Sequence, residues 1–308
     1  MRFQTRCPDV TPLTRLVEQG KVLENVPLGP LTTYKSGGPA RYLAEIDDIE
    51  SLRALIATGV TASHPLLVLG RGSNLVVADA GFAGLVIRLG RSFAETRIEG
   101  TAVTAGSAVP LPRLARTCVD QGLRGLEFFV GIPGSVGGAV RQNAGCFGSE
   151  TKDRLVEARI INLRNGAART DGPDALELSY RHSNVESDDL IIDVTFETER
   201  GNAEEGRRKI REIIRWRRDN QPGGTLNAGS VFKNPPDISA GELIDSLGLK
   251  GQRVGDVTVS DKHANFFVAG PEATSEDVRG LVDKIKERVL RLSGTILEPE
   301  IQFVGFRK

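Results

Sequence analysis

The chain has 308 residues, and its 40 Lys and Arg are balanced by 40 Asp and Glu. This length is about twice that of a typical domain and predicts two domains, or one domain with a large appendage. Because the charges cancel, no long-range field recruits nucleic acid or an anionic membrane, and we expect a small-molecule partner.

The cysteines indicate a reducing compartment. Cys7, Cys118 and Cys146 are an odd number without paired spacing, which argues against a disulfide framework. The N-terminal stretch has no apolar core of a signal peptide, and no apolar run approaches the length of a membrane span. We therefore expect a cytoplasmic protein without a membrane partner.

The three histidines and the scattered cysteines lack metal-ligand spacing, so no metal site is predicted.

The first third of the chain alternates short strands and helices. Residues 41–46 are typical of a strand, and Asp48 can cap a helix whose apolar residues recur on one side. Further strands are predicted at 65–70 and 84–89, with a glycine loop between them. This order indicates an α+β or α/β pattern.

The middle of the chain is dominated by strands. They are predicted at 96–100, 102–106, 156–163 and 189–198, interrupted by a helix at about 111–122 and a long loop at 131–145.

The composition then shifts to a strongly charged helix at 204–218, which suggests a boundary near residue 200. We expect a domain at 1–200, with subdomains of about 1–92 and 93–200, and a C-terminal domain at 201–308. In the C-terminal domain, Ser239 and Glu242 form a capping box that opens a helix. A longer helix is predicted from Thr274 to Gly294, with apolar residues at helical spacing up to Leu292.

The loop after the strand at 65–70 offers several backbone N–H groups in a tight turn, which suits a phosphate. It is not a Rossmann fingerprint, because the third glycine is missing and no helix is predicted to follow. An ordinary strand turn is the alternative. The candidate residues are Gly70, Arg71, Gly72, Ser73, Asn74 and Leu75.

The glycine-rich loop at 131–145 is too regular in its apolar spacing for a flexible linker. A flat ring or a nucleotide lying against the backbone would require such a loop, and two glycine loops can clasp one dinucleotide from both sides. A purely structural loop is the alternative. The candidate residues are Gly131, Pro133, Gly134, Ser135, Gly137, Gly138, Asn143, Ala144 and Gly145.

Three polar residues outside these loops can act on a ligand. Arg181, in LSYRHS, is either an exposed strand-end arginine or a clamp for a carboxylate. Ser230, in NAGSVFKNPP, is only partly explained by a turn. Glu300, in LEPEI, is either an edge carboxylate or part of a site. Further along the chain, VSDKHANFFV supplies polar groups suited to a phosphate or sugar, with a structural role as the alternative.

The ordered strings TYKSGGPA, VLGRGSNL, GLEFFVGIPGSVGGAVRQNAG, SYRHS, RRDNQP, NAGSVFKNP, SDKHANF and LEPEI resemble the bacterial UDP-N-acetylenolpyruvoylglucosamine reductase family. The resemblance covers roughly residues 30–305 and implies an α+β fold. That fold has a two-part FAD-binding domain of the vanillyl-alcohol-oxidase type plus a C-terminal α+β substrate-binding domain. No long insertion follows Arg181, so the chain is similar to the shorter form. It departs from the family at 32–34, which usually reads Asn-Thr-Phe.

The resemblance implies an NADPH-dependent flavoenzyme that reduces UDP-N-acetylglucosamine enolpyruvate to UDP-N-acetylmuramate for peptidoglycan. Arg181 and Glu300 would polarise the substrate carboxylate, non-covalent FAD would supply hydride, and Ser230 would supply the proton. NADPH and the sugar nucleotide would take turns at one flavin face. The oligomeric state stays open, with a monomer favoured. The expected substrate-binding residues are Arg217, Lys233, Asn234, Lys262, His263 and Asn265.

Two other functions remain open. The first is an oxidase on the same scaffold, for which Cys146 would be the residue that links the flavin covalently. The second is a flavin-binding or nucleotide-binding module without catalysis, which predicts the loss of Arg181, Ser230 or Glu300. All three residues are present.

Overall fold

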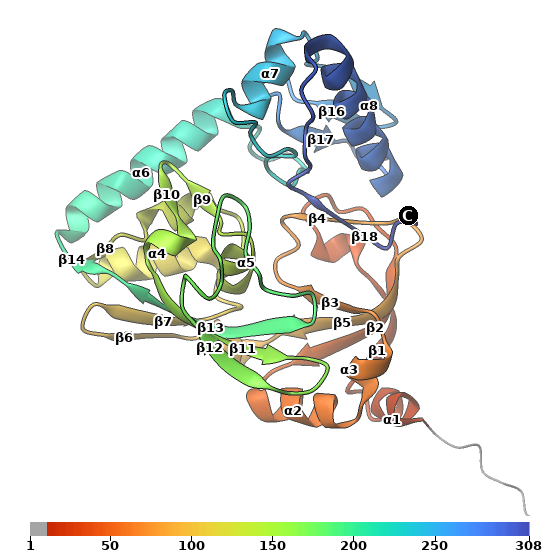
Figure 1. The fold of residues 1–308 in the computed structure, drawn as a ribbon, viewed down its shortest axis with the longest axis vertical. Coiled ribbons are helices and arrows are strands. Elements are labelled where there is room, and N and C mark those ends of the chain that lie inside the picture. Colours follow the sequence, from red (N-terminus) through yellow and green to blue (C-terminus); the bar gives the residue numbers. More distant parts are fainter. Residues whose placement is uncertain (1–10, 308) are drawn as a thin grey trace, which may run out of the picture.

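The computed structural model describes residues 11–307. Three parts of the chain surround a common centre (Figure 1), and we call them the first region (11–92), the middle region (93–220) and the C-terminal region (221–307). None of the helices within residues 11–307 is long and apolar enough to cross a membrane.

The first region contains a four-stranded sheet in the order β1-β2-β5-β3. The strand β5 pairs in parallel with both of its neighbours, whereas β1 is antiparallel. The predicted cap of α2 is confirmed, because the Asp48 carboxylate accepts a hydrogen bond from the Ser51 N–H at 2.7 Å. The elements are α1 (Pro12–Glu18), β1 (Leu23–Pro27), β2 (Pro39–Ile46), α2 (Ile49–Ala57), α3 (Val60–Ser63), β3 (Leu66–Leu69), β4 (Leu75–Val77) and β5 (Phe82–Leu89).

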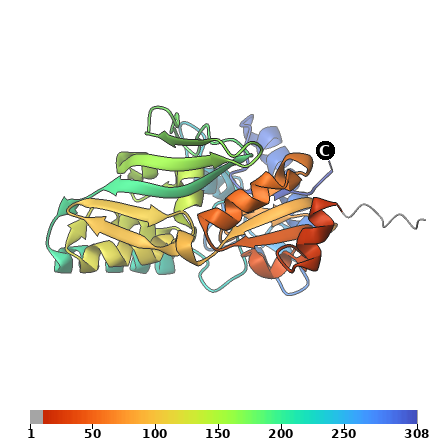
Figure 2. The same ribbon diagram turned by 90° about the horizontal axis from the view of Figure 1, so that it is seen from below.

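The middle region is built on an antiparallel sheet in the order β12-β11-β13-β7-β6. Figure 2 shows it beside the sheet of the first region, and Leu190 and Ile192 of β13 pack into the core of that region. The strands and helices are β6 (Thr96–Glu99), β7 (Ala102–Gly106), α4 (Leu111–Asp120), α5 (Val136–Arg141), β11 (Leu155–Asn162), β12 (Ala168–Asp171), β13 (Asp189–Glu197) and α6 (Ala203–Asn220). Short elements are η3 (Glu127–Gly131), β8 (Leu123–Arg124), β9 (Gly145–Cys146), β10 (Ser149–Glu150) and β14 (Glu199–Arg200).

Two features of this region differ from the sequence interpretation. Residues 131–145 are not all loop, because 136–141 form the helix α5. The glycines of α5 have low helix propensity. Val136 and Val140 are buried in the hydrophobic core of the middle region, however, and this packing outweighs the low propensity. The charged helix α6, expected to follow the boundary near residue 200, buries Ile210 and Ile213 in the same core. By packing, α6 therefore belongs with the middle region.

The C-terminal region is a small α+β unit. The predicted capping box of α7 is present. As expected, Thr274 caps the start of α8, and Gly294 closes its end in the left-handed conformation. Leu292 is 53% exposed and does not contribute to the buried face of α8. The elements are α7 (Ala240–Ser246), β15 (Arg253–Val254), β16 (Val257–Val259), β17 (Phe267–Ala269), α8 (Ser275–Ser293) and β18 (Gln302–Val304).

The end of the chain returns to the first region. Strand β18 pairs in parallel with β4, directly after the loop at 70–74. The buried Tyr34 hydroxyl donates a hydrogen bond to the Phe267 carbonyl at 3.2 Å, and Asp79 accepts bonds from the first N–H groups of α8. These contacts place Glu300 beside the loop at 70–74, where the Asn74 amide donates to the Glu300 carbonyl at 3.0 Å.

Candidate active site

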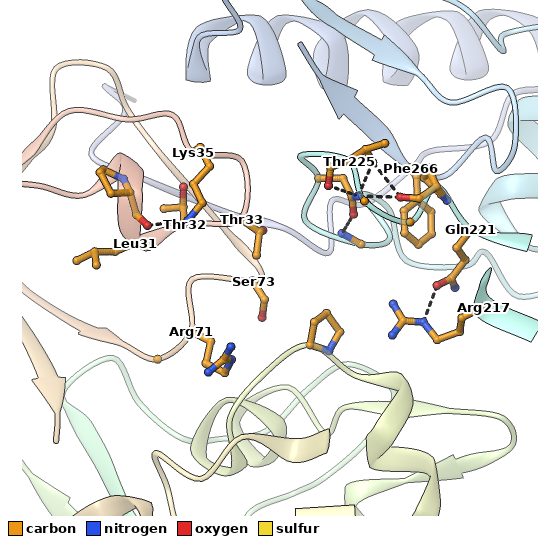
Figure 3. Close-up of a pocket in the computed structure, with 18 of the residues that line it drawn as sticks. Leu31, Thr32, Thr33, Lys35, Arg71, Ser73, Arg217, Gln221, Thr225 and Phe266 are labelled. Atoms are coloured by element: carbon orange, nitrogen blue, oxygen red, sulfur yellow. Dashed lines mark hydrogen bonds between the residues drawn. The ribbon is translucent and has the colours of Figure 1, made fainter. Parts of the chain in front are cut away.

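A cavity of about 690 Å³ lies where the three regions meet. Figure 3 shows Arg71, Ser73 and Lys35 on one side of it and Arg217 with Gln221 on the other. The lining includes no carboxylate. Its cationic residues are Lys35, Arg71, Arg88, Arg217 and Arg218. A cavity with this lining favours anions, and phosphate groups above all.

The first glycine loop forms part of the cavity wall. Gly72 has φ +61°, and a Cβ there would collide with the Leu31 carbonyl, so only glycine fits. The backbone N–H groups of Arg71, Gly72 and Ser73 donate no hydrogen bond to any residue within 11–307. These donors are free to bind an anion.

The second glycine loop adjoins the first. A Cβ on Gly70 would lie 2.9 Å from the Ser135 Oγ, and a Cβ on Gly134 would lie 3.7 Å from the Ser73 Oγ. At the start of α5, the N–H groups of Val136 and Gly137 are already bonded to carbonyls of the chain. The N–H groups of Ser135 and Gly138, by contrast, donate no hydrogen bond within residues 11–307, so both loops offer free donors.

Arg181 and Glu300 form an ion pair across two regions. Arg181 Nε donates to Glu300 Oε1 at 2.7 Å, and both side chains are less than one-fifth exposed. Arg181 Nη2 also donates to the Gly145 carbonyl at 3.1 Å, and the guanidinium lies 5.0 Å from the Tyr180 ring centre. Burial raises the pKa of Glu300 above its usual value, and the nearby charges of Arg181 and Lys233 oppose this rise.

The segment around Arg181 is a turn and not the strand considered for it. Ser179 and His182 exchange backbone hydrogen bonds, and Arg181 has φ +52°. The tight turn directs the side chain of Arg181 toward Glu300, a partner 119 residues away in the sequence.

Ser230 lies in the same neighbourhood. The next residue, Val231, accepts a hydrogen bond from the Glu300 N–H at 2.8 Å, and Ser230 itself pairs with Phe266, which lines the cavity. Gly229 has φ +77° and forms the predicted turn. The Ser230 hydroxyl makes no hydrogen bond with the described part of the chain. The segments that carry Arg181, Ser230 and Glu300 therefore converge at the edge of the cavity.

Comparisons with known proteins match both halves of the chain. Residues 40–171 match the FAD binding domain family, and residues 221–304 match the C-terminal domain of UDP-N-acetylenolpyruvoylglucosamine reductase. The reductases of Parvibaculum lavamentivorans and Rhodopseudomonas palustris are each 41% identical to the chain. The first comparison covers 94% of this chain and 93% of the relative, and the second covers 97% of each. The chain belongs to the UDP-N-acetylenolpyruvoylglucosamine reductase family.

A solved member of this family has the same fold. The crystal structure of the reductase from Thermus caldophilus aligns with a TM-score of 0.80 and 37% sequence identity, over 91% of this chain and 98% of that one. As a family member with an FAD-binding domain, the chain is a flavin-containing oxidoreductase with the α+β fold expected of it. The residues present fit the flavin dinucleotide. The loop at 70–74 offers free N–H donors to the phosphates, and glycine at position 72 lets this loop pack closely against the Leu31 carbonyl.

Two asparagines expected to contact ligands are engaged inside the protein. Asn143 is fully buried, and its amide binds Glu150, Ser179 and Lys152. Asn265 is 3% exposed and exchanges two hydrogen bonds with the backbone of Phe232. The amide of Asn143 thus supports the Arg181 turn, and that of Asn265 holds the Ser230 segment in place.

Ala144 and Gly145, two other residues predicted at the cofactor, also make contacts within the chain. The Ala144 carbonyl accepts bonds from Thr151, and the Gly145 carbonyl accepts from Arg181. Gly145 thus acts on the guanidinium through its backbone.

The expected substrate residues divide into two groups. Arg217 lines the cavity, and Lys233 lies close enough to Glu300 to affect its pKa. The other side chains bind the protein itself. Asn234 accepts from the Ala240 N–H, Lys262 donates to the Arg218 carbonyl, and His263 accepts from the Asn265 N–H.

Several cavity residues were absent from the predicted site. The motif TYKSGG pointed to Thr33 and Lys35, but its role could not be assigned from the sequence. Gln221 accepts a hydrogen bond from Arg217 Nε at 2.7 Å and thereby orients the guanidinium. Both residues lie in the string RRDNQP, and their i,i+4 spacing at a helix end was the signal that could have indicated the contact.

Cys146, the residue considered for a covalent flavin link, is held as a thiol. Burial raises its pKa to about 11, and its Sγ donates to the Phe128 carbonyl at 3.1 Å. A thiol in this state is a weak nucleophile.

Proposed function

We propose that the protein reduces the enolpyruvyl group of UDP-N-acetylglucosamine enolpyruvate with electrons from NADPH, yielding UDP-N-acetylmuramate for peptidoglycan synthesis in the cytoplasm. The observation that carries this proposal is the partly buried Arg181–Glu300 pair next to the Ser230 segment, at the edge of a cationic cavity. The names of the related reductases supply the substrate.

The substrate carries an alkene conjugated to a carboxylate, and hydride addition builds negative charge on that carboxylate. Arg181 offers a planar fork of donors to it, held by Glu300 on one side and the Gly145 carbonyl on the other. Burial raises the pKa of Glu300 above its usual value, and in its protonated form the Glu300 carboxyl group can donate a hydrogen bond to the same carboxylate. Donors that are already oriented stabilise developing charge without reorganisation.

Ser230 is the proposed proton donor. Its hydroxyl is free of hydrogen bonds within residues 11–307, and the Gly229 turn and the Asn265 contacts keep its backbone in place. An alcohol is a weak acid, but the carbon that it protonates is strongly basic once hydride has been added. Positioning is then more important than acidity, and help of this kind is typically worth about 10²- to 10⁴-fold.

Bound FAD would supply the hydride and accept a replacement from NADPH. The cavity carries five cationic side chains, and phosphates of FAD, of NADPH and of the sugar nucleotide can pair with them. Arg217, oriented by Gln221 across the cavity from Arg71, is our candidate for the diphosphate of whichever nucleotide is bound.

The test follows flavin absorbance in the purified protein without oxygen. NADPH should bleach the flavin, and the colour should return only when the enolpyruvyl nucleotide is added. Return of colour with oxygen alone, at a comparable rate, would indicate an oxidase. Failure of both nucleotides to change the flavin would leave a binding module and contradict the proposal.

A further inference from the structure

The hairpin of β9 and β10 carries a residue that its turn disfavours. Phe147 and Gly148 form the two-residue turn, with φ +54° and +77°. Positive φ at both positions is the geometry of a type I′ turn, which favours Asn-Gly. A bulky aromatic residue in the left-handed region is an outlier. The reason for Phe147 therefore lies in its ring and not in the turn.

The ring of Phe147 packs on Trp216 of α6. The ring centres are 5.2 Å apart and the planes meet at 84°, an edge-to-face arrangement. Such pairs attract each other beyond the area that they bury. Because the rings are 40% and 45% exposed, removing either one opens no hole in the core. The contact joins the tip of the hairpin to α6.

The other end of the hairpin holds Arg181. Gly145 opens β9, and its carbonyl accepts a hydrogen bond from Arg181 Nη2. A Cβ at this position would lie 2.6 Å from the Ser149 carbonyl, so the close pairing at the base depends on glycine. The guanidinium is thus held from two sides, by Glu300 of the C-terminal region and by the hairpin.

We propose that Phe147 and Trp216 are positioning residues: their contact fixes the hairpin against α6, and the hairpin aims the guanidinium of Arg181 through the Gly145 carbonyl. This inference rests on the proposed role of Arg181 at the substrate carboxylate. Neither aromatic residue is among those that line the cavity, so the pair acts through Arg181 and not by stacking on a nucleotide.

The first test compares three variants of α6 in the holoenzyme. Trp216→Ala should slow reduction of the enolpyruvyl substrate about two- to tenfold, the range expected for one aromatic pair, and leave flavin reduction by NADPH unchanged. Trp216→Phe should restore most of the rate. Ile214→Ala is the matched control, because Ile214 lies on the same helix, is 42% exposed and has no such contact. An equal loss in both half-reactions, or the same loss in the control, would overturn the proposal.

A second variant separates the ring from the helix. Phe147→Gly removes the ring and relieves the strained turn without changing α6, so stability should not fall while substrate reduction slows as in Trp216→Ala. The double variant should be no slower than either single one, because both remove one contact. Additive losses would contradict a shared contact.

Hydrogen exchange gives a readout that does not depend on catalysis. The amides of 145–150 should exchange about two- to tenfold faster in Trp216→Ala than in Ile214→Ala. If the wild-type protein does not reduce the enolpyruvyl substrate, the proposed function fails while this comparison still tests the contact. Equal exchange in the two variants would show that the aromatic pair does not hold the hairpin.

Discussion

The cavity wall and the Arg181–Ser230–Glu300 junction are built in different ways. The two glycine loops form part of the wall, where free N–H groups can bind a phosphate and glycines allow close packing of the backbone. The junction depends on three side chains from distant segments, and two of them form an ion pair across 119 residues. We expect the loops to tolerate side-chain changes that preserve their backbone, and the junction to lose function when a single reacting side-chain atom is removed.

The largest effect is expected at the junction. Ser230→Ala should slow enolpyruvyl reduction by about 10²- to 10⁴-fold while flavin reduction by NADPH stays nearly intact, because only the proton donor is removed. Stopped-flow measurement of the two half-reactions separates these steps. Ser230→Cys, which keeps a proton on the side chain, should retain part of the rate. If alanine slowed both half-reactions equally, the role of the hydroxyl would be wrong.

A steric clash in the first glycine loop of the cavity wall should weaken FAD binding. Gly72→Ala places a Cβ against the Leu31 carbonyl, so the loop must move, and FAD retention should weaken by at least about tenfold, the equivalent of roughly one hydrogen bond. FAD per chain after dialysis measures this.

Gly59→Ala is the matched control for this change. Gly59 also has positive φ, but a Cβ there meets nothing within 4 Å. Both variants share the backbone strain of about 1–2 kcal/mol, and only Gly72→Ala should lose flavin. Equal flavin loss in the two would mean that general stability, and not the wall, controls binding.

A pH profile tests the protonation of Glu300. Burial raises its pKa, so the native state holds this proton more tightly than the unfolded chain does. Stability from this group is therefore largest at low pH and declines as pH rises from the ordinary glutamate value through the raised one. For the enolpyruvyl substrate, kcat/KM should decline over the same limb, by up to about tenfold per pH unit, because ionised Glu300 repels the substrate carboxylate.

Glu300→Gln should flatten that alkaline limb, since an amide cannot ionise. A limb that persists unchanged in this variant would assign it to another group. The rate of flavin reduction by NADPH serves as the control, and it should not show this alkaline limb, because that half-reaction does not involve the substrate carboxylate.

The smallest effect is expected at the contact that connects the first and C-terminal regions. Tyr34→Phe removes the hydroxyl that donates to the Phe267 carbonyl and keeps the buried ring. It should lower the free energy of unfolding by about 1 kcal/mol, the usual net value of one hydrogen bond, with no change in the ratio of the half-reaction rates. Denaturant unfolding measures the loss. A changed ratio would show that this contact also sets the catalytic geometry.

Much of the local structure could be predicted from the sequence. Asp48, Ser239 and Thr274 each cap the expected helix, because a side-chain oxygen and the N–H that it satisfies are only three residues apart. The helix α5 could not be predicted, since its stability comes from burial in the middle core and not from its own residues.

The site shows the same division. Asn143 and Asn265 have the chemistry of ligand-binding residues, but their amides are satisfied by Ser179 and Phe232, which lie far away in the sequence. No local pattern tells a buried amide from one facing a ligand, because the difference is set by which backbone groups come within hydrogen-bond distance.

The sequence by itself determined which residues are chemically able to act: the glycine loops, the arginine, the serine and the glutamate, together with the family to which they point. Only the tertiary structure decided which of them meet. Caps and glycine turns depend on forces that act within a few residues, so they are readable in order along the chain. The pairing of Arg181 with Glu300 depends on β18 returning to β4, a contact between segments more than 200 residues apart, and only the complete fold brings these together.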